Sequence, residues 1–148
     1  AENPFDFNIM NNGMRYGFVW AMAPRHYNAS MDEAVTQPLS RYVGELIRIR
    51  KKHSEILFTG RFMDTLGATV KCGENSRYSV FESIKDKTRK AVVVVNFGNN
   101  EDEMEVNIEN VISGKAELCI PFQNDRLIQL PAKIKVPART CAVVILNP

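Results

Sequence analysis

The sequence is poor in the residues from which metal centres and many active sites are built. It has 2 histidines, 3 cysteines and 1 tryptophan in 148 residues, and no histidine follows Gly60. Cys72, Cys119 and Cys141 are odd in number and widely spaced, with neither a CxxC motif nor a Cys/His ligand spacing. We therefore predict no metal site and no cofactor. Cys119 and Cys141 fall in strand patterns and are expected to be small core residues.

Neither the charge nor the apolar runs favour a nucleic acid or a membrane as partner. The net charge of +2 gives no electrostatic basis for either, and no run approaches the ~18 apolar residues of a membrane helix. The one basic cluster, Arg48–His53, is expected at the end of a helix, where cations complement the helix dipole. The alternative is a polyanion-binding patch, although no aromatic residues interleave with these charges.

The common catalytic motifs are also missing: there is no glycine-rich phosphate loop, no G-x-S-x-G and no H-E-x-x-H. The acids between Glu101 and Glu109 cluster on one predicted strand and turn, which is typical of a solvated face. Three consecutive acids, Glu101 to Glu103, could hold calcium, but the spacing of a calcium loop is not there. The sequence thus predicts no catalytic residue in this chain.

What the chain does contain is a strand-rich region after Gly60. Lys90–Phe97, KAVVVVNF, is too short and too β-branched for a helix, and it predicts a strand covered on both faces. Thr140–Leu146, TCAVVIL, has the same character. Further strands are predicted at Ala68–Cys72, Arg77–Ser83, Glu103–Glu109, Lys115–Ile120, Arg126–Leu130 and Lys133–Val136. With no helix between them, they predict an antiparallel Greek-key β-sandwich of about 7–8 strands over residues 61–148.

The first 60 residues read differently, as a βα segment. Arg15–Met22, RYGFVWAM, is a predicted buried strand, and a capping pattern formed by Ser30 and Glu33 indicates a helix start. The helix proper is expected to restart at Pro38, a residue suited to a first turn, and to run to about residue 55. It is amphipathic, with an apolar stripe that needs a partner surface: Leu39, Tyr42, Val43, Leu46, Ile47 and Ile49.

Candidate binding residues follow the predicted N-terminal strand. Trp20 lies near its carboxyl end, and Arg25 and His26 lie in the loop after it. Ligands bind at this edge in parallel α/β architectures, where Trp20 could stack on a sugar ring and the other two could hydrogen-bond hydroxyl groups. The alternative is that Trp20 is a core residue and the other two are ordinary loop residues.

Several segments together resemble a known family. The strand GFVWAM, the helix PLSRYVGELIRIRKKHSEIL, the exit FTGRFMD and the strand pair RYSVFES…KAVVVVNFGNNEDEMEV look like the C-terminal end of a TIM-barrel glycoside hydrolase. The resemblance implies the last strand and helix of a barrel followed by an accessory sandwich that buttresses it. The catalytic carboxylates would lie on earlier strands, outside this chain. Trp20, Arg25 and His26 would then help line the sugar site of the parent enzyme.

That resemblance also implies partners and a setting. The main partner would be the remainder of the barrel, with carbohydrate as the substrate of the parent, which is expected to be secreted or periplasmic. A chain that begins with Ala rather than Met suggests processing or a segment of a longer protein. Without the barrel, Arg15–Met22 would have unpaired edges, so we expect it either to pair with a second copy, giving a dimer, or to be poorly ordered.

Two other functions remain open. One is a non-catalytic carbohydrate-binding sandwich, for which Tyr78, Phe81, Phe97 and Phe122 are the candidates, three of them in apolar strand patterns expected to be core. The other is a protein-interaction module that engages a partner through the apolar stripe of the helix.

Overall fold

The computed structural model describes the backbone of residues 29–111 and 113–148, and side chains from residue 38 onward. Contacts divide the chain into two units, Ala1–Arg48 and Ile49–Pro148. The predicted strand Arg15–Met22 lies outside the described residues, so its pairing stays a prediction.

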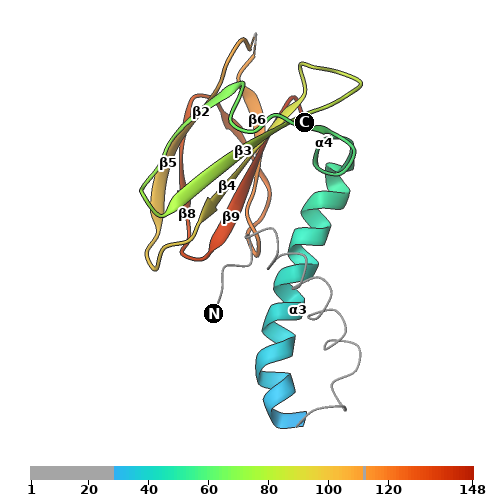
Figure 1. The fold of residues 1–148 in the computed structure, drawn as a ribbon, viewed down its shortest axis with the longest axis vertical. Coiled ribbons are helices and arrows are strands. Elements are labelled where there is room, and N and C mark those ends of the chain that lie inside the picture. Colours follow the sequence, from blue (N-terminus) through green and yellow to red (C-terminus); the bar gives the residue numbers. More distant parts are fainter. Residues whose placement is uncertain (1–28, 112) are drawn as a thin grey trace. The chain divides into compact units, whose positions relative to one another are not determined.

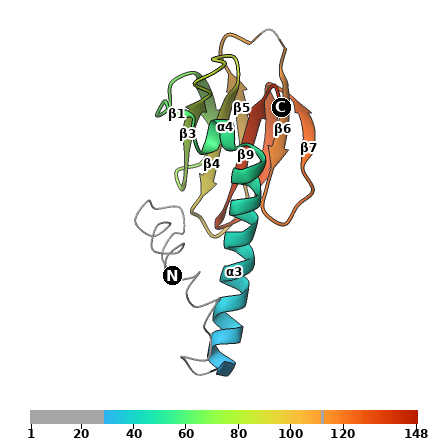
Figure 2. The same ribbon diagram turned by 90° about the vertical axis from the view of Figure 1, so that its right-hand side faces the viewer.

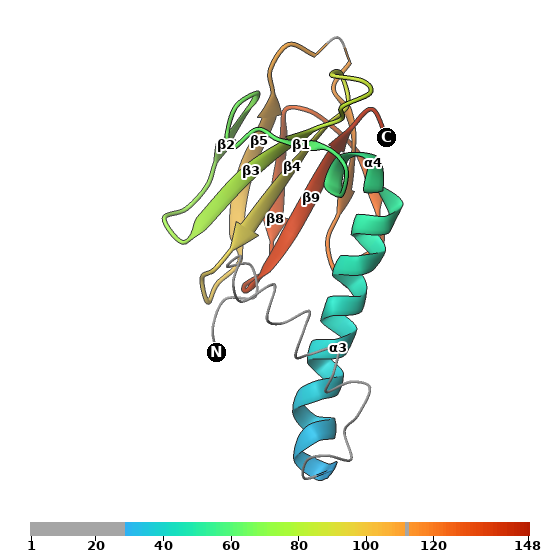
Figure 3. The same cartoon turned by 45° about the vertical axis from the view of Figure 1, so that its right-hand side comes forward.

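The second unit is a two-layer antiparallel sandwich (Figures 1 and 3). Within the described residues, one sheet has 6 strands in the order β1-β3-β4-β9-β6-β7, and the other has 3 in the order β2-β5-β8. The strands are β1 Arg61–Phe62, β2 Ala68–Lys71, β3 Ser76–Glu82, β4 Lys90–Asn96, β5 Asp102–Ile108, β6 Lys115–Cys119, β7 Arg126–Gln129, β8 Ala132–Val136 and β9 Thr140–Leu146. The predicted mostly-β antiparallel sandwich is confirmed. The described structure has one strand more than the eight predicted in this region, and this additional strand is the two-residue β1.

The central position in the larger sheet belongs to strands distant in sequence. β9 lies between β4 and β6, with Val93 opposite Val143 and Glu117 opposite Ile145 (Figure 2). All 7 residues of β9 are buried, as predicted for TCAVVIL. In β4, Ala91, Val92 and Val94 are fully buried, whereas Val93 and Val95 are only half-buried.

The main core fills the space between the two sheets. Successive side chains of a strand point to opposite faces, so alternate residues of each strand enter this core. From the larger sheet it takes Val80, Val92, Val94, Leu118 and Val144, and from the smaller sheet Met104, Val106, Ile108, Ile134 and Val136. The half-exposed strand predicted from Glu103–Glu109 is β5, whose buried residues are the apolar ones.

A second, smaller core lies on the outer face of the larger sheet. Ile49, from the last turn of α3, and Ile56, from α4 (Ser54–Leu57), pack there with Ala91, Cys119, Val143 and Ile145. Figure 2 shows α4 in front of β4 and β9. Ile56 has no exposed surface. The segment α4 follows the long helix and precedes Gly60 in the sequence, and it belongs to the unit that contains the sandwich.

The long helix α3 spans Ala29–Lys52, with Pro38 inside it. The prediction that the helix restarts at Pro38 was wrong, and the earlier start signal at Ser30 was the better one. Proline removes one backbone hydrogen bond, but the remaining bonds of a 24-residue helix carry the chain past it. The helix also ends slightly earlier than the predicted residue 55, because it breaks at His53 before α4 begins. No helix among the described residues is both long and apolar enough to cross a membrane.

Candidate functional site

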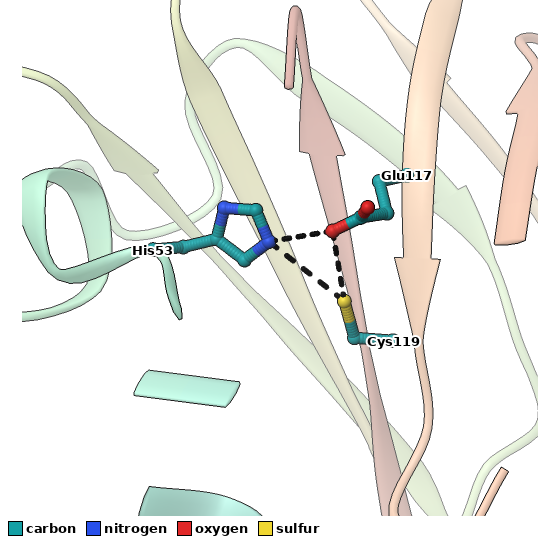
Figure 4. A group of neighbouring side chains, drawn as sticks. All are labelled: His53, Glu117 and Cys119. Atoms are coloured by element: carbon teal, nitrogen blue, oxygen red, sulfur yellow. Dashed lines mark hydrogen bonds and ion pairs between the residues drawn. The ribbon is translucent and has the colours of Figure 1, made fainter. Parts of the chain in front are cut away.

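A cluster of polar side chains lies where the end of the long helix meets strand β6. His53 stands between α3 and α4, at φ −122° and ψ 40°. Glu117 and Cys119 are two positions apart on β6, so they share the face opposite to Leu118, which enters the main core. The helix break and the strand alternation together bring the three side chains to one point (Figure 4).

The functional atoms of these residues form a triangle. Nε2 of His53 lies 2.7 Å from Oε1 of Glu117, Sγ of Cys119 lies 3.4 Å from the same oxygen, and Sγ lies 3.9 Å from Nε2. His53 is 7% exposed and Cys119 is fully buried, while the side chain of Glu117 retains 15% exposure. Among the described residues the cluster is thus nearly closed to water, and Glu117 is its most exposed member.

Two further charged residues border the cluster on its exposed side. The Lys52 ammonium group lies 3.1 Å from Oε2 of Glu117 and 2.8 Å from Oδ2 of Asp125. Both carboxylates are largely covered, at 15% and 13% exposure, whereas the Lys52 side chain is 42% exposed. Lysine therefore holds the two carboxylates together from the solvent side.

The electrostatics of the cluster keep the acid ionised and the thiol protonated. Burial alone raises the pKa of Glu117, but hydrogen bonds from His53, Lys52 and Cys119 outweigh it and hold the pKa below its usual range. Burial, reinforced by the negative charges of Asp125 and Glu117, raises the pKa of the Cys119 thiol far above its usual range. Since an ionised carboxylate only accepts hydrogen bonds, Nε2 of His53 must carry the proton that it donates to Glu117.

This arrangement does not suit nucleophilic catalysis by cysteine. In a catalytic triad, the histidine contacts the nucleophile with one ring nitrogen and the orienting acid with the other. Here Glu117 and Cys119 both approach the same nitrogen, Nε2. The thiol also has no exposed surface and is held protonated, whereas the reactive form is the thiolate. What the cluster does offer is three donor atoms of different kinds, all within 4.8 Å of one another.

A second polar network fixes α4 to the turn between β3 and β4. The Glu55 carboxylate accepts a 2.8 Å hydrogen bond from the Ser83 hydroxyl and pairs with the Arg89 guanidinium group. Arg89 also donates to the backbone carbonyl of Asn147, at 3.2 Å. Ser83 is buried, at 1% exposure. The segment after the long helix is therefore held on the sandwich in two ways. Its isoleucine side chain is buried against the sheet, and polar contacts of His53 and Glu55 lie on either side of it.

Three residues are predicted from the sequence as binding residues. Trp20, Arg25 and His26 lie outside the described residues, and their role stays a prediction. Cys119 and Cys141 are buried in strands, as predicted. In the predicted acidic run, the Asp102 carboxylate accepts hydrogen bonds from the Gly73 amide and the Ser76 hydroxyl, at 2.9 and 2.6 Å.

The cluster was missed because its members were interpreted separately. The sequence patterns place His53 at a basic helix end and Cys119 in the core, and they place Glu117 in the predicted strand Lys115–Ile120 without giving it a role. Alternation was the available signal, since Leu118 points into the core and Glu117 and Cys119 must therefore share the other face. Nothing in the sequence indicates that a helix end 64 residues earlier covers that face.

Comparisons with known proteins find no matching family model and no matching curated protein. Among solved structures, a GH30 endoxylanase from Clostridium papyrosolvens is similar at 12% identity and a TM-score of 0.42, over 51% of this chain and 21% of that one. A conserved exported protein from Bacteroides fragilis is similar at 22% identity and a TM-score of 0.36, over 49% of this chain and 14% of that one. This chain therefore spans a small part of either protein, and at these values neither similarity assigns it to a family.

Proposed function

We propose that this chain is the C-terminal accessory region of a carbohydrate-active glycoside hydrolase, and that it supports the catalytic barrel without being catalytic itself. The proposal rests on the resemblance of the helix, exit and strand-pair segments to that part of such enzymes, and on the antiparallel sandwich that follows the helix. In the parent enzyme, Trp20, Arg25 and His26 would lie toward the sugar site.

The observation that carries the structural role is the way the end of the helix is held on the sandwich. Ile49 and Ile56 are buried on the outer face of the larger sheet. His53 is bonded to Glu117 on one side of them, and Glu55 is bonded to Ser83 and Arg89 on the other. A joint made this way fixes the end of the helix, from Ile49 onward, on the sandwich, and a buttress requires such an attachment.

The first test is the reading frame upstream of Ala1. We expect it to encode a few hundred residues of alternating strands and helices, with paired acids at strand ends; a frame without them would refute the proposal. In that longer protein, a variant that weakens the joint, Glu55→Gln with Ser83→Ala, should shorten the half-life of activity at raised temperature and leave kcat/KM on a small glycoside unchanged. Leu66→Ala, on an exposed residue, is the matched control.

The opposite result would also be informative. If the joint variant kept its thermal half-life but lost kcat/KM on the small glycoside, the region would contribute to the reaction rather than to support. The same measurement on the isolated chain should show no hydrolysis, since we expect the catalytic carboxylates on earlier strands.

The carbohydrate-binding alternative is favoured by one observation. Phe58, Phe62 and Phe122 are 60–64% exposed, and exposed aromatic rings can stack on sugars. Phe58 is partly used already, because the Arg50 guanidinium group lies 4.6 Å from its ring centre. Calorimetric titration of the chain with xylo- and cello-oligosaccharides separates the two functions: binding that is lost in Phe62→Ala would favour the alternative, and absence of binding favours the structural role.

A further inference from the structure

The triangle of donor atoms has the dimensions of a metal site. A tetrahedral zinc ion, with ligand distances of about 2.0–2.3 Å, holds its ligand atoms about 3.3–3.7 Å apart. The Sγ–Oε1 and Sγ–Nε2 distances of 3.4 and 3.9 Å are close to this range, and only the 2.7 Å distance between Nε2 and Oε1 must lengthen, by about 0.6 Å. An ion inserted between the three atoms would replace the two hydrogen bonds that Oε1 of Glu117 now accepts.

We propose that His53, Glu117 and Cys119 bind one divalent transition-metal ion, with Zn²⁺ as the preferred ion. The ligands are Nε2 of His53, a carboxylate oxygen of Glu117 and the thiolate of Cys119, and the fourth position is left to water. The proposal does not need the proposed function, because it is argued only from the distances, burial and charges of these side chains; the His53–Glu117 contact is the one feature that the two share.

The donor set selects the class of ion. A mixture of one imidazole, one thiolate and one carboxylate is typical of zinc, whereas magnesium and calcium take oxygen ligands alone. Nε2 of His53 donates to Glu117, so binding requires this nitrogen to give up its proton and leaves the neutral imidazole with its proton on Nδ1. The thiol proton leaves to solvent, because a coordinating thiol is deprotonated by the ion.

The charges around the cluster favour an added cation. With a neutral imidazole and a neutral thiol, Glu117 and Asp125 contribute two negative charges and Lys52 one positive charge. A Zn²⁺ ion with a Cys119 thiolate would bring this sum to zero, in a site where His53 and Cys119 are buried and unbalanced charge is unfavourable. A protonated His53 would balance the same charge without metal, and the experiment distinguishes these two states.

The placement of the ligands gives the ion a structural role. His53 belongs to the break between the two helical segments, and the other two ligands belong to β6, whose neighbour β9 lies at the centre of the larger sheet. One ion would therefore link two segments that are 64 residues apart, and its binding free energy would add to the free energy of unfolding.

The test uses the complete chain, freed of metal with a chelator and titrated with Co²⁺ and then Zn²⁺. Cobalt reports its own ligands: we expect a thiolate-to-cobalt charge-transfer band that saturates at one ion per chain and is abolished by one equivalent of Zn²⁺. The melting temperature should rise with Zn²⁺ and fall again when the chelator is added.

Cysteine variants locate the ion. Cys119→Ser should abolish the charge-transfer band and weaken Zn²⁺ binding by at least about 100-fold, since even changes outside the ligand set weaken metal binding about 10–100-fold. Cys72→Ser is the matched control, because this half-buried cysteine lies just after β2 in the other sheet and should leave the band and the affinity unchanged. His53→Ala should weaken binding in the same way as Cys119→Ser.

A readout without variants covers the case in which Cys119→Ser does not fold. X-ray absorption on the zinc-loaded wild-type chain should show one sulfur ligand and three nitrogen or oxygen ligands. The proposal is overturned by a zinc shell without sulfur, by the absence of a thiolate band with cobalt, or by a band that Cys72→Ser removes and Cys119→Ser retains. It is overturned equally by an unchanged melting temperature at saturating Zn²⁺, the result expected if protonated His53 alone fills the site.

Discussion

Replacing Ile56 by alanine tests the joint between the helix and the sandwich most directly. Ile56 has no exposed surface and packs in the smaller core with Ile49, Ala91, Val143 and Ile145. The change removes three carbon atoms, worth about 0.8 kcal/mol each in transfer free energy, or about 2.4 kcal/mol together. A cavity left in the smaller core adds to this, so we expect a loss of about 3–4 kcal/mol in the free energy of unfolding.

Such a loss is large for a unit of this size. Ile49–Pro148 comprises 148 − 48 = 100 residues, for which a total free energy of unfolding of about 5–15 kcal/mol is typical. We would follow urea unfolding of the complete chain by far-ultraviolet circular dichroism and compare midpoints at constant slope. In a thermal scan, the same loss should lower the melting temperature by more than about 10 °C.

The control for this prediction is Leu66→Ala, on a residue that is 67% exposed. It should change the free energy of unfolding by less than about 0.5 kcal/mol. If Ile56→Ala cost no more than this control, the segment around Ile56 would not be part of the cooperative unit. The inference that the helix end is fixed on the sandwich would then be wrong.

Three further changes give distinct outcomes. Glu117→Gln, measured with chelator present, should weaken the fall in the free energy of unfolding at acid pH. The pKa of Glu117 is lower in the folded state, so its carboxylate stabilises the fold above about pH 4.5 and loses this effect as the pH falls further. An unchanged pH dependence would argue against the hydrogen bonds of Glu117. Asn96→Ala should cost about 1–3 kcal/mol in urea unfolding, because the buried amide donates to three backbone carbonyls, that of Val136 among them. Gly60→Ala should cost at least about 1–3 kcal/mol, since its Cβ would lie 2.1 Å from the backbone oxygen of Ile56; a neutral result would show that the exit from α4 can shift.

The strands of the sandwich were predictable because they depend on local alternation. Val92 and Val94 enter one core and Ala91 the other, and the run KAVVVVNF already indicated a strand covered on both faces. The start of α3 was harder, since the signal at Pro38 conflicted with the signal at Ser30. A long helix tolerates one missing backbone bond, and a local pattern does not reveal which of two start signals prevails.

The polar cluster could not be predicted in the same way, because it depends on contacts between distant segments. Glu117 and Cys119 lie in a predicted strand, Lys115–Ile120, which the structure confirms as β6. What the sequence does not encode locally is the break at His53, which turns a residue of the basic helix end toward β6. Side chains that meet only because the end of the helix packs on the sheet leave no periodic signal.

The position of β9 has a consequence for how the protein is made. Of the nine strands described, it is the last to leave the ribosome, yet it separates β1-β3-β4 from β6-β7 in the larger sheet. Until Thr140–Leu146 has been synthesised, these two blocks have no strand to join them, and each presents an open edge to the cytosol or the translocation machinery. Completion of the sheet therefore waits until β9 has emerged, and the nascent protein depends on whatever shields those edges in the interval.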